Sequence, residues 1–290
     1  MPPATENSET RAVASLPWTP LAWFGVLIIA CHAPVLQALV RQWYEDQDMG
    51  HGFFVPAIAA YIAWQKREEL LAQPLVTNWW GLLIVVYAAL QSYLASLGAE
   101  LFLARTAFVF SLIGAVLFLG GTRVARVLAF PLFLLFFMVP IPAILYNQVT
   151  FPLQLLASRT ATTILSIAQI PVLREGNILE LPNKTLSVVE ACSGIRSLLS
   201  LSFLSLVYGY FFEKSARVRI ALFLSTIPIA VLANSSRVTF TGILAEVKPD
   251  LAEGFFHILE GWVIFMVALA MLVAFHRILV MGCRAVYGQR

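Results

Sequence analysis

Three side chains with complementary chemistry stand at the ends of predicted membrane spans: Cys192, Arg237 and His257. A free thiol, with a pKa of about 8.5, is only a few per cent thiolate at neutral pH, and a helix N-terminus or a nearby cation lowers that value. A histidine titrates near neutrality and can move the thiol proton, while an arginine can hold an oxyanion or orient a carboxyl group. Together the three residue types are typical of acyl transfer through a nucleophilic cysteine.

The composition requires that such a site be built from membrane helices. Of 290 residues, 60% are hydrophobic and only 12% are charged, with a mean hydropathy of +0.82. The charged share is about half the ~25% of a soluble domain, which excludes an ordinary water-soluble enzyme. Disordered chains are poor in apolar residues, so disorder is excluded as well. We therefore predict an all-α integral membrane protein, a polytopic helical bundle.

Apolar runs between charged breaks predict about eight transmembrane helices. They lie at residues 21–40, 52–64, 80–97, 101–119, 124–144, 192–212, 218–237 and 255–275. The run at 52–64 is short for a span and contains Pro56, which favours a kinked or re-entrant segment. An amphipathic stretch at 148–168, followed by two alternating runs around Pro182-Asn183, predicts an interfacial helix and a small hairpin on the outer face. Residues 21–277 form the expected membrane domain, between cytoplasmic tails at 1–20 and 278–290.

The positions of lysine and arginine predict the orientation. Basic residues fall at alternate span ends, and eight crossings put all of these ends on one side, the cytoplasm: Lys66, Arg67, Arg123, Arg126, Lys214, Arg217, Arg219, Arg277, Arg284 and Arg290. Both termini are then cytoplasmic. Cys192 opens the sixth span, Arg237 closes the seventh and His257 begins the eighth, all at the outer face.

Taken singly, each of the three groups has an ordinary structural explanation. A lone cysteine packs like a small apolar residue, a terminal arginine snorkels, and an interfacial histidine meets water. Their common depth favours a site because the orientation was derived from lysine and arginine alone. The polar and small residues around them are expected to support it: His51, Glu190, Ser193, Gly194, Arg196 and Asn234. One cysteine and one histidine fall short of a zinc site, so no metal is expected, and neither is a cofactor or a nucleic-acid partner.

The segments that carry these residues resemble a known family. EACSGIRSLLSL, NSSRVTFTG and FFHILEGWVIF resemble the signature blocks of the exosortases, membrane-embedded cysteine transpeptidases of Gram-negative bacteria. HGFFVPAIAAYIAWQKR and FPLFLLFFMVPIPAIL extend the similarity, which covers residues 49–261 in the family's order. The resemblance implies a Cys-Arg-His site at Cys192, Arg237 and His257.

The resemblance also implies a substrate and a location. The substrates would be exported proteins with a C-terminal sorting signal: a short Pro-Glu-Pro-like (PEP-CTERM) motif, a transmembrane helix and a basic tail. The enzyme would sit in the bacterial inner membrane, with its site facing the periplasm. It would transfer the cleaved protein to a surface acceptor, often in organisms that make exopolysaccharide. The exosortase subclass, the motif it recognises and the oligomeric state stay open.

Three other interpretations stay open at this stage. An intramembrane cysteine protease would use the same residues with water as the acceptor. A non-enzymatic component of polysaccharide export or transport would use Arg105, Arg196 and Arg237 to line an anionic path; otherwise Arg105 is expected to form a structural ion pair, with Glu100 or an outer-loop carboxylate. Finally, Ser193 in place of Cys192 could be the nucleophile.

Overall fold

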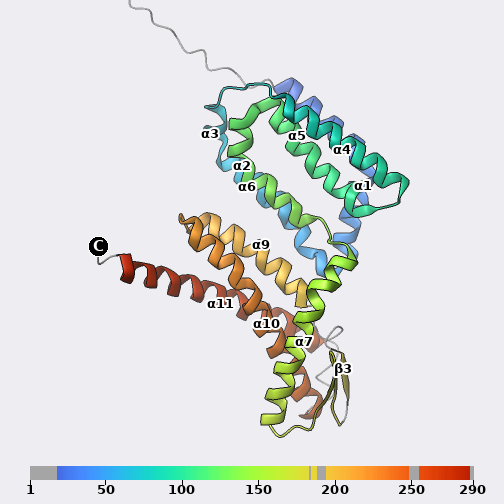
Figure 1. Cartoon of the computed structure of the whole chain (residues 1–290), viewed down its shortest axis with the longest axis vertical. Coiled ribbons are helices and arrows are strands. Elements are labelled where there is room, and N and C mark those ends of the chain that lie inside the picture. Colours follow the sequence, from blue (N-terminus) through green and yellow to red (C-terminus); the bar gives the residue numbers. More distant parts are fainter. Residues whose placement is uncertain (1–17, 183, 188–193, 248–254, 288–290) are drawn as a thin grey trace, which may run out of the picture. The chain divides into compact units, whose positions relative to one another are not determined.

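The computed structural model describes residues 18–182, 184–187, 194–247 and 255–287 (Figure 1). In the helices that begin at Trp18, Gly194 and Phe255, the first residues are described by their backbone only. The chain divides into two compact units, Met1–Gln42 with Gly52–Val139 and Trp43–His51 with Pro140–Arg290. We describe each unit by itself.

The described residues are almost entirely helical, which confirms the predicted fold class. The elements in chain order are α1 (Trp18–Glu45), η1 (Gln47–Phe53), α2 (Phe54–Gln65), α3 (Arg67–Leu71), α4 (Trp79–Leu97), α5 (Leu101–Val127), α6 (Ala129–Leu134), η2 (Leu135–Met138), α7 (Ala143–Ile167), β1 (Leu173–Glu175), β2 (Ile178–Glu180), β3 (Thr185–Ser187), α9 (Gly194–Phe212), α10 (Ala216–Val247) and α11 (Phe255–Tyr287).

Five of the described helices are long and apolar enough to cross a membrane: α1, α4, α5, α10 and α11. A sixth crossing arises if α6–η2 and α7, which Pro140 and Pro142 separate, form one broken span. The predicted second and sixth spans correspond to α2, with 12 residues, and to α9, whose described apolar stretch is Leu198–Phe212. A 12-residue helix is about 18 Å long, well short of a ~30 Å hydrocarbon core, so the count of eight stays a prediction.

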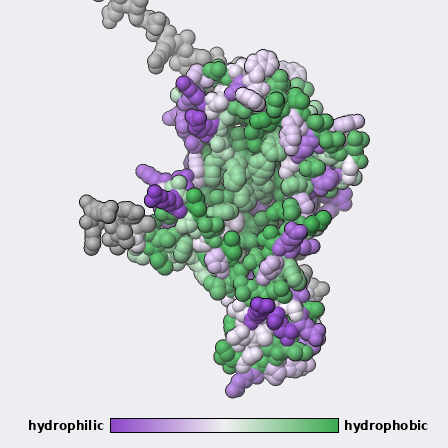
Figure 2. Space-filling model, in the orientation of Figure 1, coloured by the Kyte–Doolittle hydropathy of each residue, from purple (hydrophilic) through white to green (hydrophobic). Residues whose placement is uncertain are grey.

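The surface of the helices has the character expected of lipid-facing protein. Large apolar side chains stay exposed along α4, among them Trp79 and Trp80 at its start and Leu97 at its end. Tryptophans at a span end are typical of the membrane–water interface. In Figure 2 hydrophobic residues cover most of the helical surface, while hydrophilic residues gather beside α3 and over the small sheet.

In the first unit, α4 and α5 form a hairpin whose backbones approach closely at two glycines. A Cβ atom added to Gly81 would lie 2.6 Å from the Gly114 carbonyl oxygen and would collide with the backbone nitrogen of Phe118. One added to Gly114 would lie 2.8 Å from Val85. Small residues allow such an approach between membrane helices, where dispersion contacts and interhelical hydrogen bonds replace the hydrophobic effect. The Gln91 side chain adds such a bond, donating to Thr106 Oγ1 at 2.7 Å.

We expect Gly81→Ala to destabilise the first unit, by about 1–3 kcal/mol, because the added methyl group meets backbone that cannot move aside. The thermal unfolding temperature of the purified protein in detergent should fall. Gly25→Ala in α1 is the matched control, since nothing lies within 4 Å of its added Cβ and alanine favours a helix. Equal unfolding temperatures for the two variants would contradict the close packing of α4 on α5.

Arg105 of α5 is a buried cation of the first unit, only 5% exposed. Glu100, one of the two expected kinds of partner, acts electrostatically on Arg105 and also caps α5 by accepting a hydrogen bond from the Leu103 backbone N–H at 2.7 Å. That bond satisfies one of the open amides of the helix start. The nearby carboxylate therefore has a local structural role.

In the second unit, α10 packs between α9 and α11. The three helices share one buried apolar cluster, made of Leu201, Leu222, Ile229, Ala233, Ala268 and Leu272. Each α-helix in it thus buries one face against the others. The predicted positions of Cys192, Arg237 and His257 fall on or next to these three helices.

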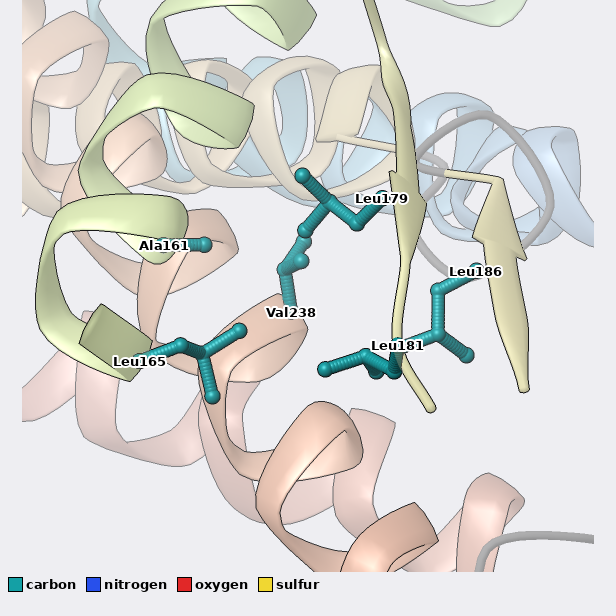
Figure 3. Close-up of a cluster of buried hydrophobic side chains, with 6 residues drawn as sticks. All are labelled: Ala161, Leu165, Leu179, Leu181, Leu186 and Val238. Atoms are coloured by element: carbon teal, nitrogen blue, oxygen red, sulfur yellow. The ribbon is translucent and has the colours of Figure 1, made fainter. Parts of the chain in front are cut away.

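A second cluster joins α7 and α10 to a small antiparallel sheet of strand order β1-β2-β3. Figure 3 shows its members pointing toward one another: Ala161, Leu165, Leu179, Leu181, Leu186 and Val238. The predicted hairpin is present as β2 and β3, which flank Pro182; β1 adds a third strand. The predicted helix at 148–168 corresponds to most of α7, which ends at Ile167, and its buried side packs against α10.

A polar cluster links the far ends of α9 and α11. His276 of α11 is 2.9 Å from the Tyr208 hydroxyl and 3.3 Å from a Glu213 carboxylate oxygen. Glu213 follows α9 and also accepts a hydrogen bond from the Ser215 backbone N–H at 2.7 Å. The pKa of Glu213 is lowered, first by the Ser215 bond and then by the bond to His276.

This depressed pKa predicts an acid-sensitive contribution to stability. A carboxyl group whose folded pKa is depressed stabilises the fold above its unfolded pKa, and the stabilisation is lost as the pH falls through the folded value. We expect the unfolding temperature of the unmodified protein to drop below about pH 4.5, the ordinary value for this group, and the drop to shrink in Glu213→Gln. Glu69→Gln, at an exposed carboxylate of α3 paired with Lys66, is the control. An acid profile unchanged by Glu213→Gln would refute this assignment.

Candidate active site

Arg237 lies on α10 with its guanidinium group against the backbone of α11. The Cβ atom that Gly261 lacks would be 3.5, 3.6 and 3.7 Å from Nη2, Cζ and Nη1 of Arg237. Three atoms of one planar group at nearly equal distance indicate that the guanidinium lies over this glycine. Gly261 thus makes room for the arginine, although it does not need a glycine-only backbone angle.

The same contact relates Arg237 to His257. His257 lies in α11 four residues before Gly261, so both positions fall on one face of the helix, about one 5.4 Å turn apart. The guanidinium therefore packs on the face of α11 that carries His257. The side chain of His257 itself lies outside the described residues.

The residue after Arg237 packs against the strand that precedes Cys192 in the sequence. Val238, the next residue, is fully buried in the cluster of Figure 3 with Leu186 of β3. β3 ends at Ser187 and α9 begins at Gly194. Glu190, Cys192 and Ser193 lie outside the described residues.

Of the supporting residues that the structure describes, some lie close to Arg237 and others lie farther along α9. Asn234 is 9% exposed and lies three residues before Arg237, on the same side of α10. His51 of η1 packs on α9 through Phe203, with ring centroids 6.4 Å apart. Phe203 is nine residues beyond Gly194, or about 13 Å along the helix axis. Gly194 and Arg196 lie in the first turn of α9, where only the backbone is described.

The sequence reasoning did not single out Thr241, a buried polar residue of α10 near Arg237. Thr241 is 3% exposed and lies four residues after Arg237, so with Asn234 it continues a polar stripe along α10. All three residues are engaged by neighbouring groups. The spacing in NSSRVTFTG was the available signal, because polar residues recur there at helical intervals.

Comparison with protein families shows to which family the chain belongs. The family described as transmembrane exosortase matches residues 43–274, most of the chain. The chain belongs to the transmembrane exosortase family. The match includes all nine candidate site residues, from His51 to His257. Comparison with curated proteins and with solved structures gave no match.

Membership supports a membrane transpeptidase of the exosortase type, in a family whose members generally use a cysteine. It also implies a multi-pass membrane protein that acts on exported proteins carrying sorting signals. Within this exosortase, α10 and α11 bring Arg237 to the helix face of His257. α9, which begins two residues after Cys192 in the sequence, packs on the same α10.

Proposed function

We propose that this exosortase cleaves C-terminal sorting signals through a thioacyl-enzyme intermediate on Cys192. The observation that carries the proposal is the packing of Arg237 over Gly261, one turn from His257. It places the cation of α10 on the same face of α11 as a titratable group, and α9, the helix that follows Cys192 in the sequence, packs on α10. Acyl transfer needs a nucleophile, a proton carrier and an oxyanion partner, and these three residues supply them.

The steps follow from these roles. The Cys192 thiolate attacks the scissile carbonyl carbon. The guanidinium group of Arg237 stabilises the negative charge that develops on the carbonyl oxygen. The carbon–nitrogen bond then breaks as His257 gives a proton to the leaving amine. A thioester remains until an acceptor amine or water attacks it, transfers its proton to His257 and releases the thiolate.

The neighbouring residues hold this constellation in place. Asn234 and Thr241, one turn before and one turn after Arg237 on α10, fix the position of its side chain. The small residues Ser193 and Gly194 leave space for the substrate next to Cys192. We assign Arg196 and Glu190 to a local contact that orients the helix start, and His51 to a packing contact with Phe203 farther along α9. None of these exchanges atoms with the substrate.

We further propose that the substrates are exported proteins with a Pro-Glu-Pro-like motif, a transmembrane helix and a basic tail. The exosortase would lie in the inner membrane with both termini in the cytoplasm and its site facing the periplasm. Thiol labelling tests this orientation in spheroplasts of a chain in which Cys31, Cys192 and Cys283 are all replaced, so that the introduced cysteine is the one thiol. A cysteine at Asp48 or Asp250 should react, and one at Lys66 should be spared; the reverse pattern would overturn the orientation.

The fate of the thioester separates transfer from hydrolysis. We expect mass spectrometry of a processed protein from the host to find its new C-terminus extended by an acceptor. A free C-terminal carboxylate on all processed molecules would show that water is the acceptor and that the exosortase acts as a protease. A search of the host's proteins for C-terminal motif, span and basic tail supplies the substrates for this experiment.

A further inference from the structure

An apolar groove runs between α10 and α11, in the half of these helices that lies away from Arg237. Its volume is about 520 Å³, and it is lined by residues between Ala221 and Leu232 of α10 and between Met271 and Ile278 of α11. The one hydroxyl of the lining, on Ser225, donates to the Leu222 carbonyl at 2.7 Å. The groove therefore offers its occupant almost nothing but hydrocarbon.

The dimensions of the groove fit one acyl chain. Ala221 to Leu232 covers about 16 Å along α10, half of a ~30 Å hydrocarbon core and thus the depth of one leaflet. The volume lies within the ~300–1,000 Å³ of small-ligand sites. A helix of ~10 Å diameter would occupy about 1,300 Å³ over the same length, more than twice the space available.

Two exposed arginines flank one end of this groove. Arg217 lies one helical turn before Ala221 on α10, and Arg277 lies three residues after Ala274 on α11. Since α10 and α11 are antiparallel, with Arg237 beside Gly261, both arginines fall at the end formed by Ala221 and Ile278. Glu213, the nearest carboxylate in the sequence, is already bonded to Ser215 and His276.

We propose that this groove binds an anionic phospholipid, with one acyl chain between α10 and α11 and its phosphate group between Arg217 and Arg277. Guanidinium groups bind phosphate through paired hydrogen bonds, and basic pockets between membrane helices favour anionic headgroups. A transmembrane peptide with a basic flank would instead meet two like charges at this end. The bound lipid would stabilise the packing of α10 against α11, the two helices that carry Arg237 and His257.

Photo-crosslinking tests the proposal on the full-length protein in nanodiscs. The probes are phosphatidylglycerol and phosphatidylcholine with a photoreactive acyl chain, and crosslinked peptides are mapped by mass spectrometry. We expect phosphatidylglycerol to label peptides of 221–232 and 271–278 at least about tenfold more than phosphatidylcholine. The double variant Arg217→Gln/Arg277→Gln should abolish this preference, and Ala274→Trp should block labelling by both lipids.

The control variant removes the same number of positive charges as the variant at the groove. Arg123→Gln/Arg126→Gln removes two exposed arginines of α5 and should leave the preference unchanged. In the unmodified protein, 0.5 M NaCl should reduce the preference for phosphatidylglycerol. This measurement does not depend on whether a variant folds. Equal labelling by the two lipids, equal loss in the α5 variant, or displacement of phosphatidylglycerol by an apolar peptide with a lysine tail would overturn the proposal.

Discussion

Replacing Cys192 with alanine should abolish processing of sorting-signal substrates, with a loss of about 10³-fold or more. Without the thiol no thioester can form, and the remaining residues can only polarise the scissile carbonyl. The measurement is an immunoblot of the substrate's precursor and processed forms in cells, with the membrane abundance of the exosortase verified alongside. Processing that continues in Cys192→Ala would refute the proposed nucleophile.

Two further changes complete the cysteine series. Cys31→Ser/Cys283→Ser should process normally and become the background in which thiol alkylation reports on Cys192 alone. Cys192→Ser should lose nearly as much activity as Cys192→Ala, because a serine hydroxyl is far less ionised than a thiol. Activity that survives both Cys192→Ser and alkylation would instead identify Ser193 as the nucleophile.

The second large effect concerns the space in which Arg237 lies. We expect Arg237→Gln to lower the processing rate by about 10²–10³-fold, as the loss of an oxyanion partner does. Gly261→Leu should approach the same loss, because its side chain would occupy the position of the guanidinium. Gly261→Ala should stay within a few-fold of the unmodified enzyme, since 3.5 Å is an ordinary van der Waals distance.

Gly282→Leu is the matched control for that series. It makes the same substitution on α11 at a glycine with no atom within 4 Å of its added Cβ. We expect normal processing from it. If Gly261→Leu were fully active while Arg237→Gln was not, the arginine would act from another position than the one described.

The arginines also separate catalysis from transport. A transport path would give graded losses for lysine at Arg105, Arg196 and Arg237, and little effect of Cys192→Ala. For catalysis we expect Arg237→Lys to be impaired by loss of the planar fork, while Arg105→Lys changes mainly stability. The buried position of Arg105 in α5 agrees with a structural role.

Local sequence patterns were sufficient for the helices and for part of the sheet. Apolar runs predicted α4, α5 and α10, and the alternation around Pro182 predicted β2 and β3. β1 was missed because its residues, Leu173-Arg174-Glu175, include two adjacent charged residues and show no alternation of apolar with polar side chains. α2 ends at Gln65 after only 12 residues, so hydropathy alone could not decide whether it crosses the membrane.

Contacts between distant segments were beyond the sequence. Arg237 and Gly261 meet only through the packing of α10 on α11, which depends on how the two helices interlock. His276 lies 63 residues from Glu213 and 68 from Tyr208, and nothing in the spacing links them. Glu100 acts on the charge of Arg105, as was expected of one possible partner, but its second role as the cap of α5 was not predicted.

Trapping the covalent intermediate tests the central claim most directly. The purified exosortase is mixed with a host substrate, quenched in acid within one turnover and digested for mass spectrometry. We predict that the peptide containing Cys192 carries the N-terminal part of the substrate, with a mass lower by one water, and that neutral hydroxylamine releases it. Cleaved substrate with no such adduct, or an adduct on Ser193 that resists hydroxylamine, would contradict the account.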